Sequence, residues 1–95
     1  MAVAELALWK GSAEQIDRWA RMQQEEIRAV VERHAGRAFW LANREKGEAV
    51  TLTLHESDEA AKATYEEVLQ IRRRIIETTG CEVTHAGAYE VVILV

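Results

Sequence analysis

Hydrophobic and polar positions alternate along the chain with two different spacings, one typical of strands and one typical of helices. The short apolar run Ala2–Lys10 ends at Gly11, and Ser12 with Gln15 three residues later forms a capping box that opens a helix. A stripe of side chains at steps of three or four residues then predicts one buried helix face. The stripe consists of Ile16, Ala20, Gln23, Ile27, Val30 and His34, and Gly36 is the expected end of the helix.

The middle of the chain has the pattern of two strands joined by a tight turn. Strands are expected at Arg37–Arg44 and Ala49–His55, where the hydrophobic pattern has a period of two. Between them, Glu45-Lys46-Gly47 supplies a glycine where a type I turn followed by a bulge needs a positive φ. These residues therefore predict a β-hairpin.

The last part of the chain predicts a second helix and a final strand. Ser57 caps this helix and Gly80 closes it. Its expected buried stripe is Ala61, Thr64, Tyr65, Val68, Leu69, Ile71, Ile75 and Ile76. Glu82–Val95 then has the pattern of one strand, or of a bent pair of strands with a weak point at Ala86-Gly87.

The predicted order of elements, β-α-β-β-α-β, indicates an α+β fold of the ferredoxin-like type. Such a fold has a four-stranded antiparallel sheet with two helices on one face, so the other face is left open. A face open to water should be polar, but Val91–Val95 reads Val-Val-Ile-Leu-Val, which is apolar on both sides of a strand. We therefore expect a homodimer in which a second copy of the sheet covers this face.

Composition limits the classes of function. The 95 residues are 48% hydrophobic and 29% charged, which predicts one globular domain spanning residues 1–95. A net charge of -4 argues against a nucleic-acid or membrane partner, because both carry negative charge. The single cysteine, Cys81, excludes an internal disulfide, and the first residues do not have the pattern of a signal peptide. We therefore expect a cytoplasmic protein.

The junction between the third strand and the second helix resembles a known family. Residues Thr51–Ala63 read Thr-Leu-Thr-Leu-His-Glu-Ser-Asp-Glu-Ala-Ala-Lys-Ala. This segment is similar to the Thr-Leu-Trp-Glu-Ser-Glu-Glu-Ala segment of the antibiotic biosynthesis monooxygenase-like proteins, in the dimeric α+β barrel superfamily. The Arg44–Gly47 turn, Gly80 and Ala88–Val91 also fit members of that family. The resemblance implies a dimeric α+β barrel, with a pocket between sheet and helices in each protomer.

The resemblance also bears on cofactors. Haem-degrading members use an Asn, a Trp and a His, whose positions fall here near Ala4, at His55, and at or near Thr64 or Tyr65. All three differ, and we expect no cofactor. The three histidines of the chain also lack the local spacing of a metal site, so no metal is expected.

The register of the hairpin decides which strand side chains share a face, since successive side chains alternate. With a three-residue loop, Arg44 opposes Glu48, and the pocket face, as the resemblance assigns it, carries Phe39, Leu41, Asn43, Thr51, Thr53 and His55. The opposite face is apolar, and we expect Trp40, Leu52, Leu54 and alternate residues of Val91–Val95 in the dimer interface. A two-residue Lys46-Gly47 loop, which remains open, would exchange the faces of the first hairpin strand.

His55 is the candidate catalytic residue. A histidine ring titrates near neutral pH, so it could take a proton from a phenolic or enolic substrate before that substrate meets oxygen. Tyr65 is expected to border the same cavity, because helical side chains lean toward the helix N-terminus. The alternative is a histidine that supports the helix start through Ser57, Glu56 or water.

Two hypotheses about function follow from these residues. One is a cofactor-independent monooxygenase that acts on an aromatic or polyketide-like small molecule, with His55 as base and Phe39, Leu41, Asn43, Thr51, Thr53 and Tyr65 as substrate-binding residues. The other is a non-catalytic protein of the same fold that binds a hydrophobic small molecule or serves in dimerisation.

Overall fold

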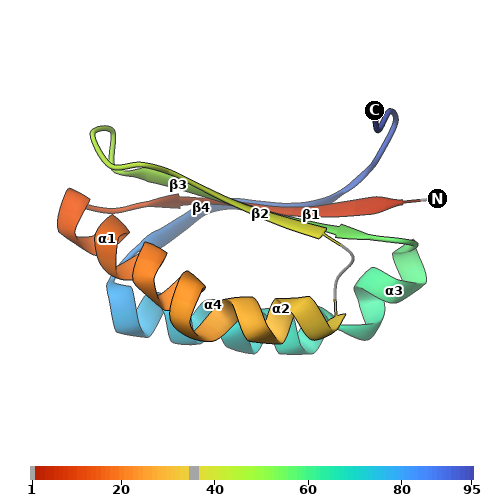
Figure 1. The fold of residues 1–95 in the computed structure, drawn as a ribbon, viewed down its shortest axis with the longest axis horizontal. Helices are drawn as coiled ribbons and strands as arrows, with labels where there is room; N and C mark the ends of the chain where they lie inside the picture. The colour runs from red at the N-terminus through yellow and green to blue at the C-terminus, as the bar shows by residue number, and fades with distance from the viewer. Residues whose placement is uncertain (1, 35–36) are drawn as a thin grey trace.

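The computed structural model describes residues 2–34 and 37–95, and its elements follow the predicted order (Figure 1). Four strands form one antiparallel sheet in the order β2-β3-β1-β4. They are β1 (Val3–Lys10), β2 (Arg37–Asn43), β3 (Glu48–His55) and β4 (Glu82–Glu90). The helices lie together on one face of the sheet (Figure 1). The predicted ferredoxin-like α+β fold is confirmed.

Both predicted helices are present, but each is divided. The first consists of α1 (Ala13–Met22), the π-helical turn η1 (Gln23–Ile27) and α2 (Arg28–His34). The second consists of α3 (Asp58–Ala63) and α4 (Tyr65–Thr79), which meet at Thr64. Thr64 leaves helical geometry at ψ 1°, and its hydroxyl donates to the Ala61 carbonyl at 3.2 Å. The predicted end of the first helix, Gly36, lies outside the described residues.

The predicted helix caps are confirmed. The Ser12 hydroxyl accepts from the Gln15 backbone N–H at 3.1 Å, and the Ser12 N–H donates to the Gln15 side chain at 2.8 Å. Ser57 caps α3 in the same way, accepting from the backbone N–H of Ala60 at 3.1 Å. Gly80 ends α4 at φ 78°, in the left-handed region that favours glycine.

The final strand is shorter than predicted. β4 runs through Ala86 and Gly87 without a break and ends at Glu90, and its irregularity lies nearer its start, opposite Leu8 and Trp9. Beyond it, Val91 donates its N–H to the Ala2 carbonyl at 2.9 Å. The expectation of a strand up to Val95 was therefore wrong, because β1 begins at Val3 and offers no further ladder partner. Figure 1 shows this tail rising from the side of the sheet that the helices leave open.

The predicted hairpin register was also wrong. Asn43 pairs with Glu48, so the loop has four residues, Arg44–Gly47, rather than three. The Asn43 side chain accepts from the Lys46 N–H at 3.1 Å, and Gly47 donates its N–H to the Arg44 carbonyl at 3.2 Å. These bonds close the loop one residue earlier on β2, and a shift of one residue moves every β2 side chain to the other face.

The core lies between the helices and the sheet face that they cover. Trp9 of β1 and Trp19 of α1 are both buried, with ring centroids 6.2 Å apart. Ile16 and Cys81 are completely buried beside them, and Trp40 of β2 packs against this cluster. Trp40 was predicted in the dimer interface, and the corrected register instead turns it toward the helices, on the same face as Thr51.

The opposite sheet face is apolar and uncovered in the single chain. We call this surface the open face; it carries Leu8, Phe39, Leu41, Val50, Leu52, Leu54 and Tyr89. Phe39, Leu41 and Tyr89 are 51%, 57% and 47% exposed. Ordinary protein surfaces expose apolar residues singly, whereas here they form one continuous patch on a sheet face.

Candidate functional site

Three neighbouring cavities lie between the sheet and the helices. The outer groove, of about 570 Å³, lies between the first helix and β2 and is lined by Trp19, Gln23, Val31, Trp40 and other residues. The middle cavity, of about 80 Å³, shares Gln23, Val31 and Trp40 with the groove. The inner cavity, of about 40 Å³, shares Val31, Thr53, Val68 and Ile71 with the middle cavity. The cavities therefore form a series that leads from the β2 edge toward His55.

His55 lies at the inner end of this series. It is the last residue of β3, is only 5% exposed and lines the inner cavity together with Thr53. Its Nε2 atom has no hydrogen-bond partner among the described residues. The Ser57 hydroxyl instead accepts from the backbone N–H of Ala60, and His55 Nε2 makes no hydrogen bond to Ser57 or Glu56.

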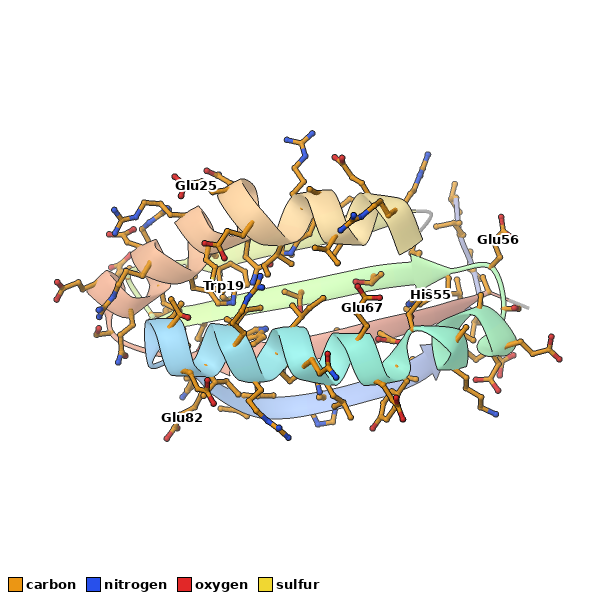
Figure 2. All side chains as sticks on the ribbon, turned by 90° about the horizontal axis from the view of Figure 1, so that it is seen from below. Trp19, Glu25, His55, Glu56, Glu67 and Glu82 are labelled. Atoms are coloured by element: carbon orange, nitrogen blue, oxygen red, sulfur yellow. The ribbon has the colours of Figure 1, made fainter. Side chains whose placement is uncertain are left out.

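A carboxylate lies beside the His55 ring. Glu5 Oε1 is 3.4 Å from His55 Nε2, and the Glu5 side chain is 15% exposed. The separation suits an ion pair if the ring is protonated, but the two groups are not aligned as a hydrogen bond. Glu67 of α4 also lines the inner cavity, and Figure 2 shows it with His55 in the space between the two long helical segments. The inner cavity thus combines the His55 imidazole and the Glu67 carboxylate with two threonines and an apolar wall, and Glu5 of the adjoining middle cavity lies next to the ring.

Two threonines of β3 face the same series of cavities. Thr51 lines the middle cavity, and Thr53 lines both the middle and the inner cavity. The Thr51 hydroxyl accepts from Trp9 Nε1 at 3.3 Å, which helps to hold the indole in the core. Thr51, Thr53 and His55 therefore share the helix-covered face, as the alternation along one strand predicts.

The other four predicted site residues lie elsewhere. Phe39, Leu41 and Asn43 were predicted on the pocket face, and the four-residue loop turns them to the open face. Tyr65 was predicted to border the cavity with His55, but it is 55% exposed and lines none of the three cavities. The break at Thr64 changes the helical phase between α3 and α4, so Thr64 and Val68 line the inner cavity instead.

Gln23 is a site residue that the sequence analysis did not single out. It belongs to the predicted buried stripe of the first helix, where its immediate stripe neighbours Ala20 and Ile27 are apolar. In the structure it is 3% exposed and lines both the outer groove and the middle cavity. A polar residue on a predicted buried face was therefore the signal that could have identified it.

The mouth of the outer groove carries most of the site's charge. Arg28, Arg37 and Arg44 line it, together with Glu32. Arg28 pairs with Glu32 at 2.8 Å, and Arg44 pairs with Asp17 of α1. Among the side chains that the structure describes, those of residues 2–33 and 37–95, no three from histidine, cysteine or acidic residues gather closely enough to hold a metal ion. No helix in this part of the chain is long and apolar enough to cross a membrane.

The comparisons with known proteins identify the fold. No protein-family model and no curated protein matches the chain. A solved structure does: a monooxygenase from the gene ActVA-Orf6 of Streptomyces coelicolor, in complex with the ligand nanaomycin D. The similarity has a TM-score of 0.67 at 13% sequence identity and covers 98% of this chain and 90% of that one. The chain therefore has the ferredoxin-like α+β fold of that monooxygenase.

Proposed function

We propose that the protein is a cofactor-independent monooxygenase acting on an aromatic or polyketide-like small molecule. The observation that carries this proposal is His55, a buried imidazole whose Nε2 lacks a hydrogen-bond partner among the described residues and which lines a cavity beside Glu5. The fold shared with the Streptomyces monooxygenase supports the same activity. Thr51 and Thr53 are the proposed polar contacts to the substrate within the cavities.

The chemistry proposed for His55 is the removal of a substrate proton. In an anthrone the CH2 group lies between two aryl rings, across the central ring from the ketone, so its anion is delocalised onto the ketone oxygen. Once deprotonated, it can give electrons to molecular oxygen without a metal or flavin. One oxygen atom becomes the new carbonyl of the product, and the other leaves as water with the two substrate hydrogens. The imidazole takes the first proton, and the Glu5 carboxylate stabilises the positive ring that results, because opposite charges attract strongly in a poorly solvated site.

The dimensions of the cavities indicate how such a substrate would enter. Pockets for ligands of this size usually measure about 300–1,000 Å³. The outer groove, at about 570 Å³, is in that range, whereas the middle and inner cavities are not. A polycyclic substrate would occupy the groove and reach His55 by moving Val31, which lines all three cavities.

Oxygen uptake tests this proposal. Purified protein free of flavin, haem and metal is mixed with a hydroxylated anthrone, and oxygen consumption is followed with formation of the anthraquinone. We expect uptake that His55→Ala and His55→Gln each reduce about 100-fold or more, since a general base contributes at least that factor. Glu56→Gln is the control, because the adjacent Glu56 is exposed and points away from the cavities (Figure 2). No uptake above the uncatalysed rate with a panel of anthrones, or equal uptake by the His55 variants, would refute the proposal.

One observation favours the alternative, a non-catalytic protein that binds a small molecule. His55 does not line the outer groove, which of the three neighbouring cavities is the one with room for a ring system. A ligand held there would lie against Trp19, Gln23 and Trp40 without reaching the base. Tight binding of an anthraquinone without oxygen uptake from any anthrone would favour this alternative.

The proposed assembly is a homodimer formed through the open face. The apolar side chains Leu52 and Leu54, predicted for the interface from sequence, lie on that face. The tail Val91–Val95, exposed from Val92 onward, extends from the same side of the sheet and would add apolar area (Figure 1). Burial of this surface against a second copy would remove it from water.

A further inference from the structure

The side-chain amide of Gln23 has no hydrogen-bond partner among the described residues. The residue is 3% exposed, and both its Oε1 and its Nε2 are buried without a hydrogen-bond partner among the described residues. Unpaired buried amides are rare in folded proteins because removal from water is costly. A ligand that supplies the missing partners would account for a glutamine at this position.

A second unpaired group lies on the same helix face. Trp19, four residues before Gln23, is 1% exposed, and its Nε1 also lacks a partner among the described residues. Both residues line the outer groove, where Trp40 and Val31 supply apolar wall. Two residues that line the groove therefore hold one unpaired indole donor and one unpaired amide, which both donates and accepts, just beneath its apolar surface.

The backbone at Gln23 is unusual as well. Gln23 begins the π-helical turn η1, in which the Arg28 N–H donates to the Gln23 carbonyl instead of to residue 24. Isolated π-helical turns are uncommon and occur frequently at functional sites. Ile27, at the other end of the turn, is 2% exposed, so the turn keeps both side chains on the buried side.

We infer that Gln23, with Trp19, recognises the polar edge of the ligand bound in the outer groove. The inference rests on the proposed function only in that the groove binds a planar aromatic molecule. The complementary ligand carries a hydrogen-bond donor and an acceptor side by side on its ring edge, as in a lactam or a hydroxy-ketone. A purely hydrocarbon ring would leave the amide unpaired and should therefore bind more weakly.

A matched pair of ligands tests this inference. 2-Quinolone has a ring N–H beside a carbonyl, and 1-methyl-2-quinolone has the same ring and carbonyl without the donor. By titration calorimetry we expect the wild type to bind 2-quinolone about tenfold more tightly. Gln23→Met, which keeps the length of the side chain but loses its hydrogen bonds, should abolish this preference. Gln70→Met is the control, because Gln70 is exposed on α4 and lines none of the three cavities.

Thermal unfolding separates a binding role from a structural one. If Gln23 serves the ligand, Gln23→Met melts at the same temperature as the wild type or higher, because the unpaired amide is gone. Lower melting of Gln23→Met with the preference intact would overturn the inference, as would equal affinity of the wild type for the two quinolones or no binding of either at millimolar concentration. Binding is measured without oxygen turnover, so inactivity toward anthrones would refute the monooxygenase proposal and leave this result unaffected.

Discussion

Glu5 and His55 lie on neighbouring strands with their side chains 3.4 Å apart, between Glu5 Oε1 and His55 Nε2. Val3 pairs with His55 in the sheet and Glu5 pairs with Thr53, so the two side chains are diagonal neighbours on the helix-covered face. Both side chains are largely withdrawn from water, at 15% and 2% exposed. This arrangement places a carboxylate where positive charge would develop if His55 accepted a proton.

The Glu5–His55 arrangement predicts the effect of Glu5→Gln on oxygen uptake. Loss of the negative charge should lower kcat by roughly ten- to a hundredfold and leave KM nearly unchanged, because the charge acts on protonated His55 rather than on the substrate. Steady-state oxygen uptake with an anthrone measures both constants. Unchanged kcat in Glu5→Gln would contradict a role for this carboxylate, with Glu56→Gln as the control for removal of a nearby acidic group.

If the proposed homodimer forms through the open face, a charge introduced there should dissociate it. Leu41 is 57% exposed in the single chain, so Leu41→Lys should leave the protomer folded. In a face-to-face dimer the ammonium group would be buried without a partner, and we expect dimer affinity to fall more than about tenfold. Light scattering over a concentration series measures this, and Leu69→Lys on the helical side is the control. A wild-type chain that stays monomeric at micromolar concentration would disprove the barrel.

Gly47 is predicted to be intolerant of any side chain. Its φ is 67°, and an added Cβ would lie 2.2 Å from the Gly11 carbonyl oxygen, which belongs to the neighbouring β1–α1 turn. Gly47→Ala should lower the free energy of unfolding by about 2 kcal/mol or more, from backbone strain and displacement of the Gly11 loop together. Urea denaturation measures the change. Lys46→Ala, at an exposed position of the same loop, should stay within about 0.5 kcal/mol of the wild type.

Ile16 of the first predicted helix stripe and Tyr65 of the second should differ in how much their replacement by alanine lowers the free energy of unfolding. Ile16 is completely buried, so Ile16→Ala should lower the free energy of unfolding by about 2–5 kcal/mol. Tyr65→Ala should change it by less than about 0.5 kcal/mol and leave quinolone affinity unaltered, because the ring is 55% exposed and lines none of the three cavities. Equal losses in the two variants would show that Tyr65 is packed in the folded protein.

The sequence by itself determined the features that depend on neighbours within about four residues. The capping box of Ser12 and Gln15, the cap at Ser57 and the left-handed Gly80 all formed as predicted, because both partners of each bond are close in the chain. The element order, and with it the fold, followed from the same local signals. His55 on one face with Thr51 and Thr53 followed from the alternation along a single strand.

Only the tertiary structure decided the register of the paired strands and the packing of side chains from different elements. The pairing of Asn43 with Glu48 depends on side-chain and backbone bonds in the loop, and a change of one residue exchanged the faces of Phe39 and Trp40. Tyr65 turned outward because the helix breaks at Thr64, and the hydrophobic periodicity of the sequence does not predict this break. The unpaired amide of Gln23 and the contact between Glu5 and His55 exist because separate elements pack together, and no sequence spacing encodes a distance between side chains on different elements.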